Sequence, residues 1–363
     1  MKKIDSYILK KFLTTFFFSI LLMTVIAVVI DISEKTDDFV QSKLSAWEIF
    51  TQYYTAFIPR IDAMLFPLFV FLGVIFFTSK MAARTEVVAI ISSGVSFRRF
   101  LLPYWIGGIF LMMLLWSVNH FVLPAANTKW VIFENKYIPG STTLQMGGAY
   151  QRNYYFRLDS NSYAGMHTYD TSSKIGNDFF IQEVRNNQLV YNLRADNISW
   201  DTAQKKWKLV SVMERHFTGD KEDMKYNRTV YKQYNFYPSD LRRGEFLKDG
   251  LSTPELDKKI KLERLRGNEG INSLLVERYN RDAIPVSVLI LTLIGAILAS
   301  KKVRGGSGLH LAIGIIFSVL YILFGRFSSI FSIKGSFHPL LAAWVPNIIF
   351  GIIAYYFYRR AAR

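Results

Sequence analysis

The segment Arg84–Arg99, RTEVVAIISSGVSFRR, places one acid among several basic residues between two long apolar runs. It predicts a short helix over residues 84–94, in which apolar residues recur at helical spacing: Val87, Ile90 and Ile91. Gly94 is typical of a helix end, and Ser96 begins the next segment. Glu86 falls in the first turn, where a carboxylate either stabilises the helix dipole or projects towards a basic group on a partner.

Residue types that would support catalysis are scattered along the chain. There is no Walker-type phosphate loop, GxSxG or HExxH, and the glycines of VRGGSG precede an apolar run, which indicates a flexible turn. The histidines lack the spacing of metal ligands: His120, His167, His216, His310 and His338. The absence of cysteine excludes disulfides and cysteine-ligated metals. We therefore predict no catalytic site, cofactor or metal, so the energy for any work must come from another protein.

The elements that carry these residues are dominated by apolar runs of about 20 residues, the length that a helix needs to cross a bilayer. They cover approximately residues 12–30, 56–79, 100–123, 283–300, 309–330 and 340–358. Pro59 and Pro67 are expected to kink the second span. The first run is too long for a signal peptide and lacks a cleavage site, so we expect it to be retained as a span.

The basic residues indicate which side of the membrane each loop occupies. The formal net charge is +16, and 14 basic residues against Asp5 and Glu86 lie in the short segments on the side of the N-terminus. By the positive-inside rule, both termini and the segment 84–99 are cytoplasmic, and residues 124–281 lie on the far side. This pattern accounts for the excess charge without a nucleic-acid partner.

The polar region between the third and fourth spans has the pattern of β structure. Short runs rich in Tyr, Phe, Val and Ile alternate with turn-forming segments: YQRNYYFRL, FFIQEV, QLVYNLRADNISW, KWKLVSVMERHF and RTVYKQYNFY. The predicted fold is a helical membrane protein with six transmembrane helices and an inserted all-β, jelly-roll-like domain. Its expected parts are residues 1–123, the β-domain 124–252, a helical return segment 253–282, and residues 283–363.

The run RTEVVAIISSGVS and the order of the spans resemble the LptF/LptG permease family, the membrane subunits of the bacterial lipopolysaccharide exporter. The segment ERYNRDAIPVSVLILTLIGAILA is also similar to that family's entry into the fourth span. The resemblance covers essentially the whole chain and does not separate the F-type from the G-type subunit. It implies a non-catalytic, inner-membrane permease subunit that extracts lipopolysaccharide from the outer leaflet. The implied partners are a second LptF/LptG-type subunit, a cytoplasmic LptB-type ATPase dimer and a periplasmic LptC-type bridge protein.

The resemblance also gives the charged residues expected roles. Coupling to the ATPase is expected of Arg84, Glu86, Val87, Ile90 and Gly94, with Glu86 at the position of the family's coupling acid. Lipid A carries phosphates, for which arginine and lysine are natural donors. Lipid binding is expected of Lys35, Arg60, Lys129, Lys136, Arg278, Arg281 and Arg326.

Each of these roles has an alternative. Arg326 lies within an apolar span, where it is paired, faces a water-filled cavity or extends to the interface. Asp62 is placed to neutralise Arg60, and the other basic residues fit a solvated surface. Five phenylalanines of the second span either line a cavity for acyl chains or pack against helices and lipid: Phe66, Phe69, Phe71, Phe76 and Phe77.

Two other functions stay open. A secondary lipid transporter usually has internal repeats and acids near mid-membrane, and the spans here carry almost no interior acids. A membrane-anchored scaffold or mechanotransmission protein would move or display the β-domain. The short helix between two spans favours movement over display.

Overall fold

The computed structural model describes residues 3–138, 150–159, 161–170, 173–219, 221–238, 241, 245–266, 270–301 and 306–361. The chain forms two compact units. The helical unit contains residues 1–133, 249–253 and 272–363, and the β unit contains residues 134–248 and 254–271. Each unit has its own apolar core.

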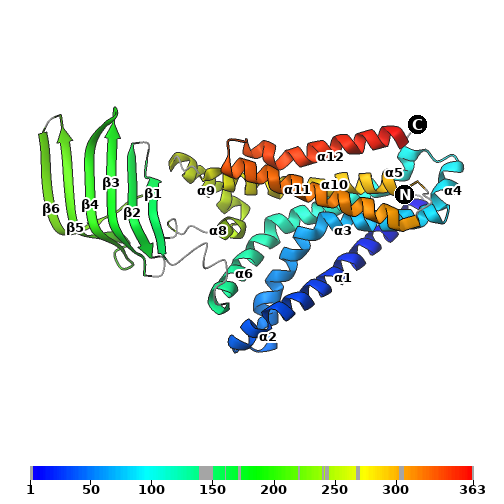
Figure 1. Ribbon diagram of the computed structural model, residues 1–363, viewed down its shortest axis with the longest axis horizontal. Helices are drawn as coiled ribbons and strands as arrows, with labels where there is room; N and C mark the ends of the chain where they lie inside the picture. Colours follow the sequence, from blue (N-terminus) through cyan, green and yellow to red (C-terminus); the bar gives the residue numbers. More distant parts are fainter. Residues whose placement is uncertain are drawn as a thin grey trace. The chain divides into compact units, whose positions relative to one another are not determined.

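The helical unit is built from long helices and short joining turns (Figure 1). In chain order these are α1 (Lys3–Gln41), α2 (Ala46–Ile49), the π-helix η1 (Phe50–Tyr54), α3 (Thr55–Ala83), α4 (Glu86–Ser92), α5 (Phe97–Ser117), the π-helix η2 (Val118–Val122), α6 (Leu123–Tyr137), α10 (Ile271–Ala299), α11 (Gly306–Lys334) and α12 (Pro339–Ala361). Within the described residues, six helical segments are long and apolar enough to span a membrane, which confirms the six predicted spans. Pro59 and Pro67 both lie inside the continuous helix α3.

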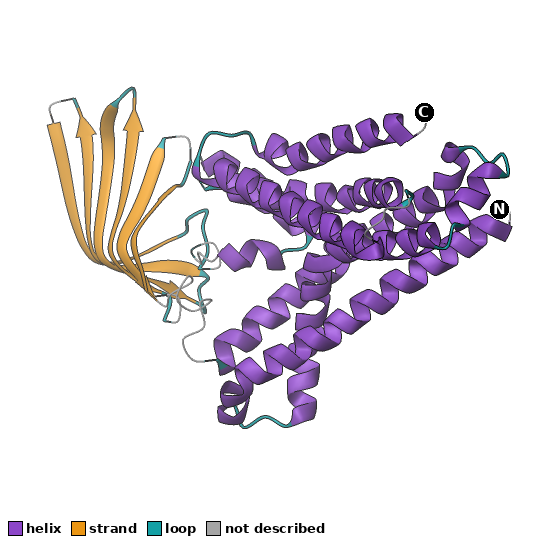
Figure 2. Cartoon of the chain, turned by 45° about the vertical axis from the view of Figure 1, so that its right-hand side comes forward, coloured by secondary structure: helices purple, strands orange, loops and turns teal. Residues whose placement is uncertain are grey.

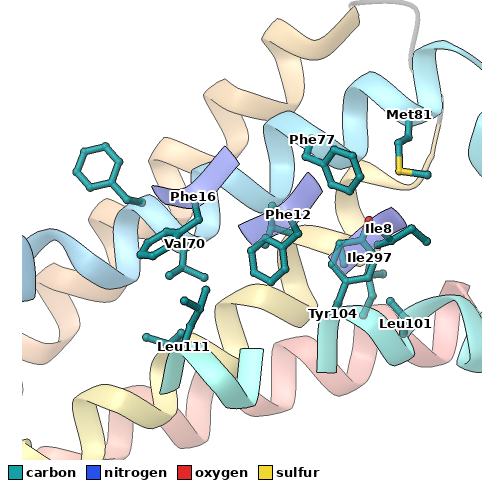
Figure 3. Packing of buried hydrophobic residues seen from close by; sticks show 14 of the residues in the cluster. Ile8, Phe12, Phe16, Val70, Phe77, Met81, Leu101, Tyr104, Leu111 and Ile297 are labelled. Atoms are coloured by element: carbon teal, nitrogen blue, oxygen red, sulfur yellow. The ribbon is translucent and has the colours of Figure 1, made fainter. Parts of the chain in front are cut away.

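Close packing of α1 against α3 and α5 forms the larger core of this unit. Figure 3 shows side chains from these helices and from α10 interleaved around Phe12, Phe16, Val70, Tyr104 and Ile297. Two glycines permit the close approach. A Cβ atom on Gly107 of α5 would lie 2.7 Å from the Phe12 ring, and one on Gly73 of α3 would lie 3.4 Å from the Phe16 backbone. The three helices therefore form one packed body.

The described residues of the β unit contain six strands in one antiparallel sheet (Figure 2). They are β1 (Tyr150–Arg157), β2 (Ser162–Asp170), β3 (Ile175–Arg185), β4 (Gln188–Asp201), β5 (Lys206–Thr218) and β6 (Lys221–Lys232), and two helices follow, α8 (Glu245–Gly250) and α9 (Thr253–Arg266). The inserted all-β part of the prediction is confirmed. The described strands follow one another in the sheet in chain order, from β1 to β6.

Strand β2 lies outside the strands predicted from the sequence. Its segment SYAGMHTYD contains small residues, which weaken the strand pattern. The fold requires one of them, because a Cβ atom on Gly165 would lie 2.6 Å from the Tyr155 ring and 2.7 Å from that of Phe180. The turn before β2 is held by Asp159, whose pKa is lowered because its carboxylate accepts the backbone N–H of Asn161 and Ser162.

The core of the β unit is centred on Trp207 of β5. This side chain is fully buried, and its Nε1 atom donates to the carbonyl oxygen of Phe236 at 2.9 Å. The Phe236 ring packs on Trp207 with the ring centres 5.0 Å apart, and Tyr234 stacks on Phe236. The segment after β6 therefore returns to cover one face of the sheet.

Strand pairing is interrupted along one line that crosses the sheet. The register of paired residues skips a facing position on each of five strands at this line: His167, Asp178, Asp196, Ser211 and Arg228. Two of them have left-handed backbones, Asp178 with φ 51° and Ser211 with φ 57°. A side chain in this conformation costs about 1–2 kcal/mol relative to the right-handed form. The interruption thus belongs to the structure of the whole sheet and is not a local irregularity of one strand pair.

The strain at Ser211 generates a stability prediction. We expect Ser211→Gly to stabilise β4 and β5 over Ser211→Ala by about 1 kcal/mol, because glycine adopts positive φ without a steric penalty. Hydrogen exchange of the β4 and β5 amides in the full chain measures this as a roughly fivefold slower exchange for the glycine variant. Equal exchange rates in the two variants would show that the site carries no strain.

Candidate functional site

The predicted short helix of residues 84–94 is present as α4, which spans Glu86–Ser92. It is shorter than predicted because the backbone is left-handed on both sides, with φ 61° at Thr85 and 87° at Gly94. These two residues separate α4 from α3 and α5. Arg84 and Gly94 therefore lie in the joints, and both are exposed.

The apolar residues of α4 divide between the core and the surface. Val87 is 1% exposed and lies in the core of the helical unit, with Ile90 packed at the edge of that core. Val88 and Ile91 are 51% and 40% exposed. Val87 thus anchors the helix, and Val88 and Ile91 leave an apolar surface exposed. Periodicity alone does not separate these two roles in a helix of two turns.

Glu86 lies beside the start of α1. Its Oε2 atom accepts a hydrogen bond from the Tyr7 hydroxyl at 3.3 Å, and the residue is half-buried. After α4 in the chain, the guanidinium of Arg99 in the first turn of α5 forms a 2.5 Å ion pair with Asp5 of α1, which is only 5% exposed. Sequence analysis missed these three partners. The sequence did contain one indication of these contacts, because Asp5 and Glu86 are the only acids in the basic segments on the side of the N-terminus.

Three of the predicted lipid-binding residues meet at the opposite end of α1. Lys35 donates to the Tyr53 hydroxyl at 2.6 Å, the Arg60 guanidinium lies 3.7 Å from the centre of the Trp130 ring, and Lys129 donates to the Thr51 carbonyl at 2.6 Å. The Lys35 ammonium also lies 6.0 Å from the centre of the Trp130 ring. We call Lys35, Arg60 and Lys129 the basic cluster.

A π-helical turn orders the base of this cluster. The turn η1 places two successive tyrosines in the interior, and both Tyr53 and Tyr54 donate to the carboxylate of Asp31 at 3.0 Å. Asp31 also lies 3.8 Å from the Lys35 ammonium. An α-helix turns 100° per residue, so two neighbouring side chains reach one acid more readily where the helix widens. The acid and the tyrosines together fix the position of Lys35.

Arg278 and Arg281 belong to a different network. Asp282 accepts hydrogen bonds from Arg278 at 2.6 Å, Trp116 at 3.1 Å and His120 at 3.1 Å. Arg281 is 4% exposed and pairs with Glu277 at 2.9 Å. Both arginines are therefore held by acids of their own helix, and the structure does not bring them into the basic cluster.

The remaining predicted residues are dispersed. Arg326 is exposed on α11, and within the described residues it makes no ion pair. Lys136 is exposed in the β unit, with its ammonium 4.7 Å from the centre of the Tyr137 ring. Asp62 accepts a hydrogen bond from Thr24 of α1 at 2.6 Å. Of the five phenylalanines, Phe76 is 45% exposed and the others are buried in helix packing: Phe66, Phe69, Phe71 and Phe77.

Within the described residues, no group of three His, Cys, Asp or Glu side chains is placed to hold a metal ion. His120 joins Asp282 and Thr253, and His310 lies 3.0 Å from the Lys301 carbonyl oxygen. The arrangement supports two kinds of chemistry: contact with a partner at α4, and binding of an anion at the basic cluster.

Comparison with known proteins gives one match over nearly the whole chain. A family model described as "Lipopolysaccharide export system permease LptF/LptG" matches residues 6–360. No curated protein matches the chain.

The ion pair at the start of α1 is testable by a double-mutant cycle. We expect Asp5→Ala and Arg99→Ala each to lower the thermal midpoint of the full chain, because each leaves a partly buried charge without its partner. The double variant should lose less than the sum, with a coupling energy of about 1–3 kcal/mol. Lys11→Ala, which removes an exposed charge from the same end of α1, is the control. Strict additivity would contradict the interaction.

Proposed function

This chain belongs to the LptF/LptG family of lipopolysaccharide export permeases, and on that premise we propose how it moves lipid. It is a multi-pass inner-membrane protein and a permease component of an ABC transporter, a component that is itself non-catalytic. It works in a complex with other subunits. The proposed mechanism is that a cytoplasmic LptB-type ATPase dimer grips α4 and thereby moves the helices around a lipid-binding chamber.

The observation that carries this proposal is the construction of α4. It exposes Val88 and Ile91 beside the half-buried acid Glu86, which is a surface suited to a groove on a second protein. Its buried side is joined to three spans through Val87, through Tyr7 and through the joints to α3 and α5. A force applied to α4 from the aqueous side would act on α1, α3 and α5 together.

The proposed orientation is that α4 and both termini lie in the cytoplasm and the β unit lies in the periplasm. The distribution of basic residues supports it by the positive-inside rule. The packing agrees, because Asp5 and Tyr7 near the N-terminus contact Arg99 and Glu86, and Tyr358 and Ala361 near the C-terminus pack against the core that contains Val87. Figure 1 shows both marked ends of the chain beside α4.

The basic cluster is the proposed site for the phosphates of lipid A. Lys35, Arg60 and Lys129 lie on three different helices, α1, α3 and α6. Lys35 contacts Tyr53 and Trp130, Arg60 lies over the Trp130 ring, and Lys129 donates to Thr51 and Thr55. Such a site at the outer end of the spans would receive lipopolysaccharide from the outer leaflet. Arg326, exposed on an apolar helix, is proposed as a separate lipid contact. A second LptF/LptG-type subunit would close the chamber.

The β unit is proposed to receive the extracted lipid and to pass it on. Strand β6 is paired on one side only among the described strands, and most of its residues are exposed. An edge of this kind accepts a further strand from another protein. The LptC-type bridge protein would extend the sheet in this way.

Removing the carboxylate of α4 should uncouple the permease. We expect Glu86→Ala to insert normally, to lose co-purification with the ATPase and to abolish growth of cells that depend on it. Two control variants should preserve export. Tyr7→Phe removes only the internal hydrogen bond to Glu86, and Glu34→Ala removes an exposed acid at the other end of α1. Normal export by the Glu86→Ala protein would overturn the coupling role.

The basic cluster is testable by photo-crosslinking to lipopolysaccharide. We expect the combined variant Lys35→Ala, Arg60→Ala and Lys129→Ala to reduce crosslinking by about tenfold or more, because charge-assisted hydrogen bonds contribute about 1.5–3 kcal/mol each. Arg326→Leu should reduce it less. The matched control is Lys10→Ala with Lys11→Ala, which removes charge at the opposite end of α1. If the control lowered crosslinking equally, the effect would come from the loss of net charge and the basic cluster would not be the binding site.

A further inference from the structure

The helical unit carries a groove that none of these roles uses. It lies between the start of α5 and the ends of α10 and α12, and its volume is about 600 Å³. This volume falls within the range of about 300–1,000 Å³ typical of ligand pockets. Its walls include Leu102 and Trp105 of α5, Ile297 of α10, and Gly351 and Tyr355 of α12. It therefore lies at the α4 end of the bundle, away from the basic cluster.

The open face of the groove is apolar and aromatic. Leu102, Trp105 and Tyr355 are 39%, 42% and 61% exposed, and they lie on helices that are long and apolar enough to span a membrane. Tryptophan and tyrosine are enriched where a bilayer meets water, because one end of each ring system is apolar and the other is polar. These residues mark the groove as a surface in contact with lipid near one membrane interface.

One charged side chain lines the groove. Arg98, in the first turn of α5, is exposed, and among the described residues it makes no hydrogen bond or ion pair. The next residue, Arg99, is paired with Asp5. The ends of the other two helices add charge of the same sign, since Lys301 follows α10 and Arg359 and Arg360 lie in the last turn of α12. The end of the groove thus favours an anion next to an apolar chain.

We propose that this groove binds one anionic glycerophospholipid of the cytoplasmic leaflet. An acyl chain lies against Leu102 and Gly351, and the phosphate receives hydrogen bonds from Arg98. This site lies at the other end of the helix bundle from the proposed lipopolysaccharide site. It faces the other leaflet, and different helices form it. It binds a lipid that stays in place, and its assignment to the cytoplasmic leaflet rests on the orientation proposed above.

The location gives this lipid a mechanical consequence. The four residues Ser93 to Ser96 join α4 to α5, and Arg98 is the second residue of α5. A lipid in the groove contacts α5, α10 and α12 at once, so it braces the start of α5 against the two C-terminal helices. Bilayers rich in anionic lipid would then stiffen the attachment of α4.

Two glycines provide a matched test of the acyl-chain site. A Cβ atom on Gly351 meets nothing within 4 Å, and the same is true of Gly325 on α11, which lies outside the groove. We expect the full-length complex, purified in nanodiscs that contain phosphatidylglycerol and phosphatidylcholine, to retain one tightly bound phosphatidylglycerol per chain in native mass spectrometry. Gly351→Leu should lower that retention about tenfold, and Gly325→Leu should leave it unchanged. Equal retention in both variants would overturn the proposal.

The headgroup is tested separately. Arg98→Ala should lower phosphatidylglycerol retention by about tenfold, and Arg98→Lys should restore most of it because the charge returns. Equal retention of phosphatidylcholine and phosphatidylglycerol by the unmodified chain, which needs no variant, would contradict the anionic preference. A photoreactive residue at position 102 should crosslink to lipid, and a crosslink to a polypeptide instead would show that a protein occupies the groove.

Discussion

The close approach of α1 to α3 and α5 is the constraint on which the other features of the helical unit depend. In a bilayer there is little hydrophobic gain from joining two apolar helices, so association depends on tight contact and small residues. Gly107 accepts the Phe12 ring where a Cβ atom would lie 2.7 Å away, and Gly73 gives similar access to the backbone at Phe16. Without these contacts, a movement of α4 would displace only the short segments that join it to α3 and α5. With them, α4 is attached to a body of three spans.

Polar groups at the ends of this body are placed by departures from α-helical geometry. The turn η1 aims Tyr53 and Tyr54 at Asp31, and η2 carries His120, which reaches Asp282 and Thr253. Buried polar atoms are costly unless they are hydrogen-bonded, so each π-helical turn is stabilised by the partners that it brings together. The two networks therefore affect the basic residues beside them differently. One network leaves Lys35 beside Arg60 and Lys129, whereas the other holds Arg278 and Arg281 against acids.

The sequence predicts the features that depend on local pattern. Span length, hydropathy and loop charge locate the six membrane helices, and Glu86, Gly94 and Ser96 locate α4 to within two residues at each end. What it does not predict depends on contacts distant in the chain. The burial of Val87 beside exposed Val88, the Asp5–Arg99 pair and the separation of the seven basic residues all require the helix packing. Strand β2 was missed for the same reason, because the need for a glycine at position 165 comes from the rings of Tyr155 and Phe180 on the neighbouring strands.

Helix α1 connects the two ends on which the proposed mechanism depends. At its start, Asp5 is paired with Arg99 of α5 and Tyr7 donates to Glu86 of α4. Near its end, Asp31 and Lys35 form the base of the basic cluster. The helix is continuous from Lys3 to Gln41, and at 1.5 Å per residue the interval between Tyr7 and Lys35 is about 42 Å. A rigid helix of this length converts a small tilt at one end into a larger displacement at the other. Under the proposed coupling, a movement of α4 therefore needs no chain of side-chain rearrangements to displace the lipid site, because the same helix belongs to both.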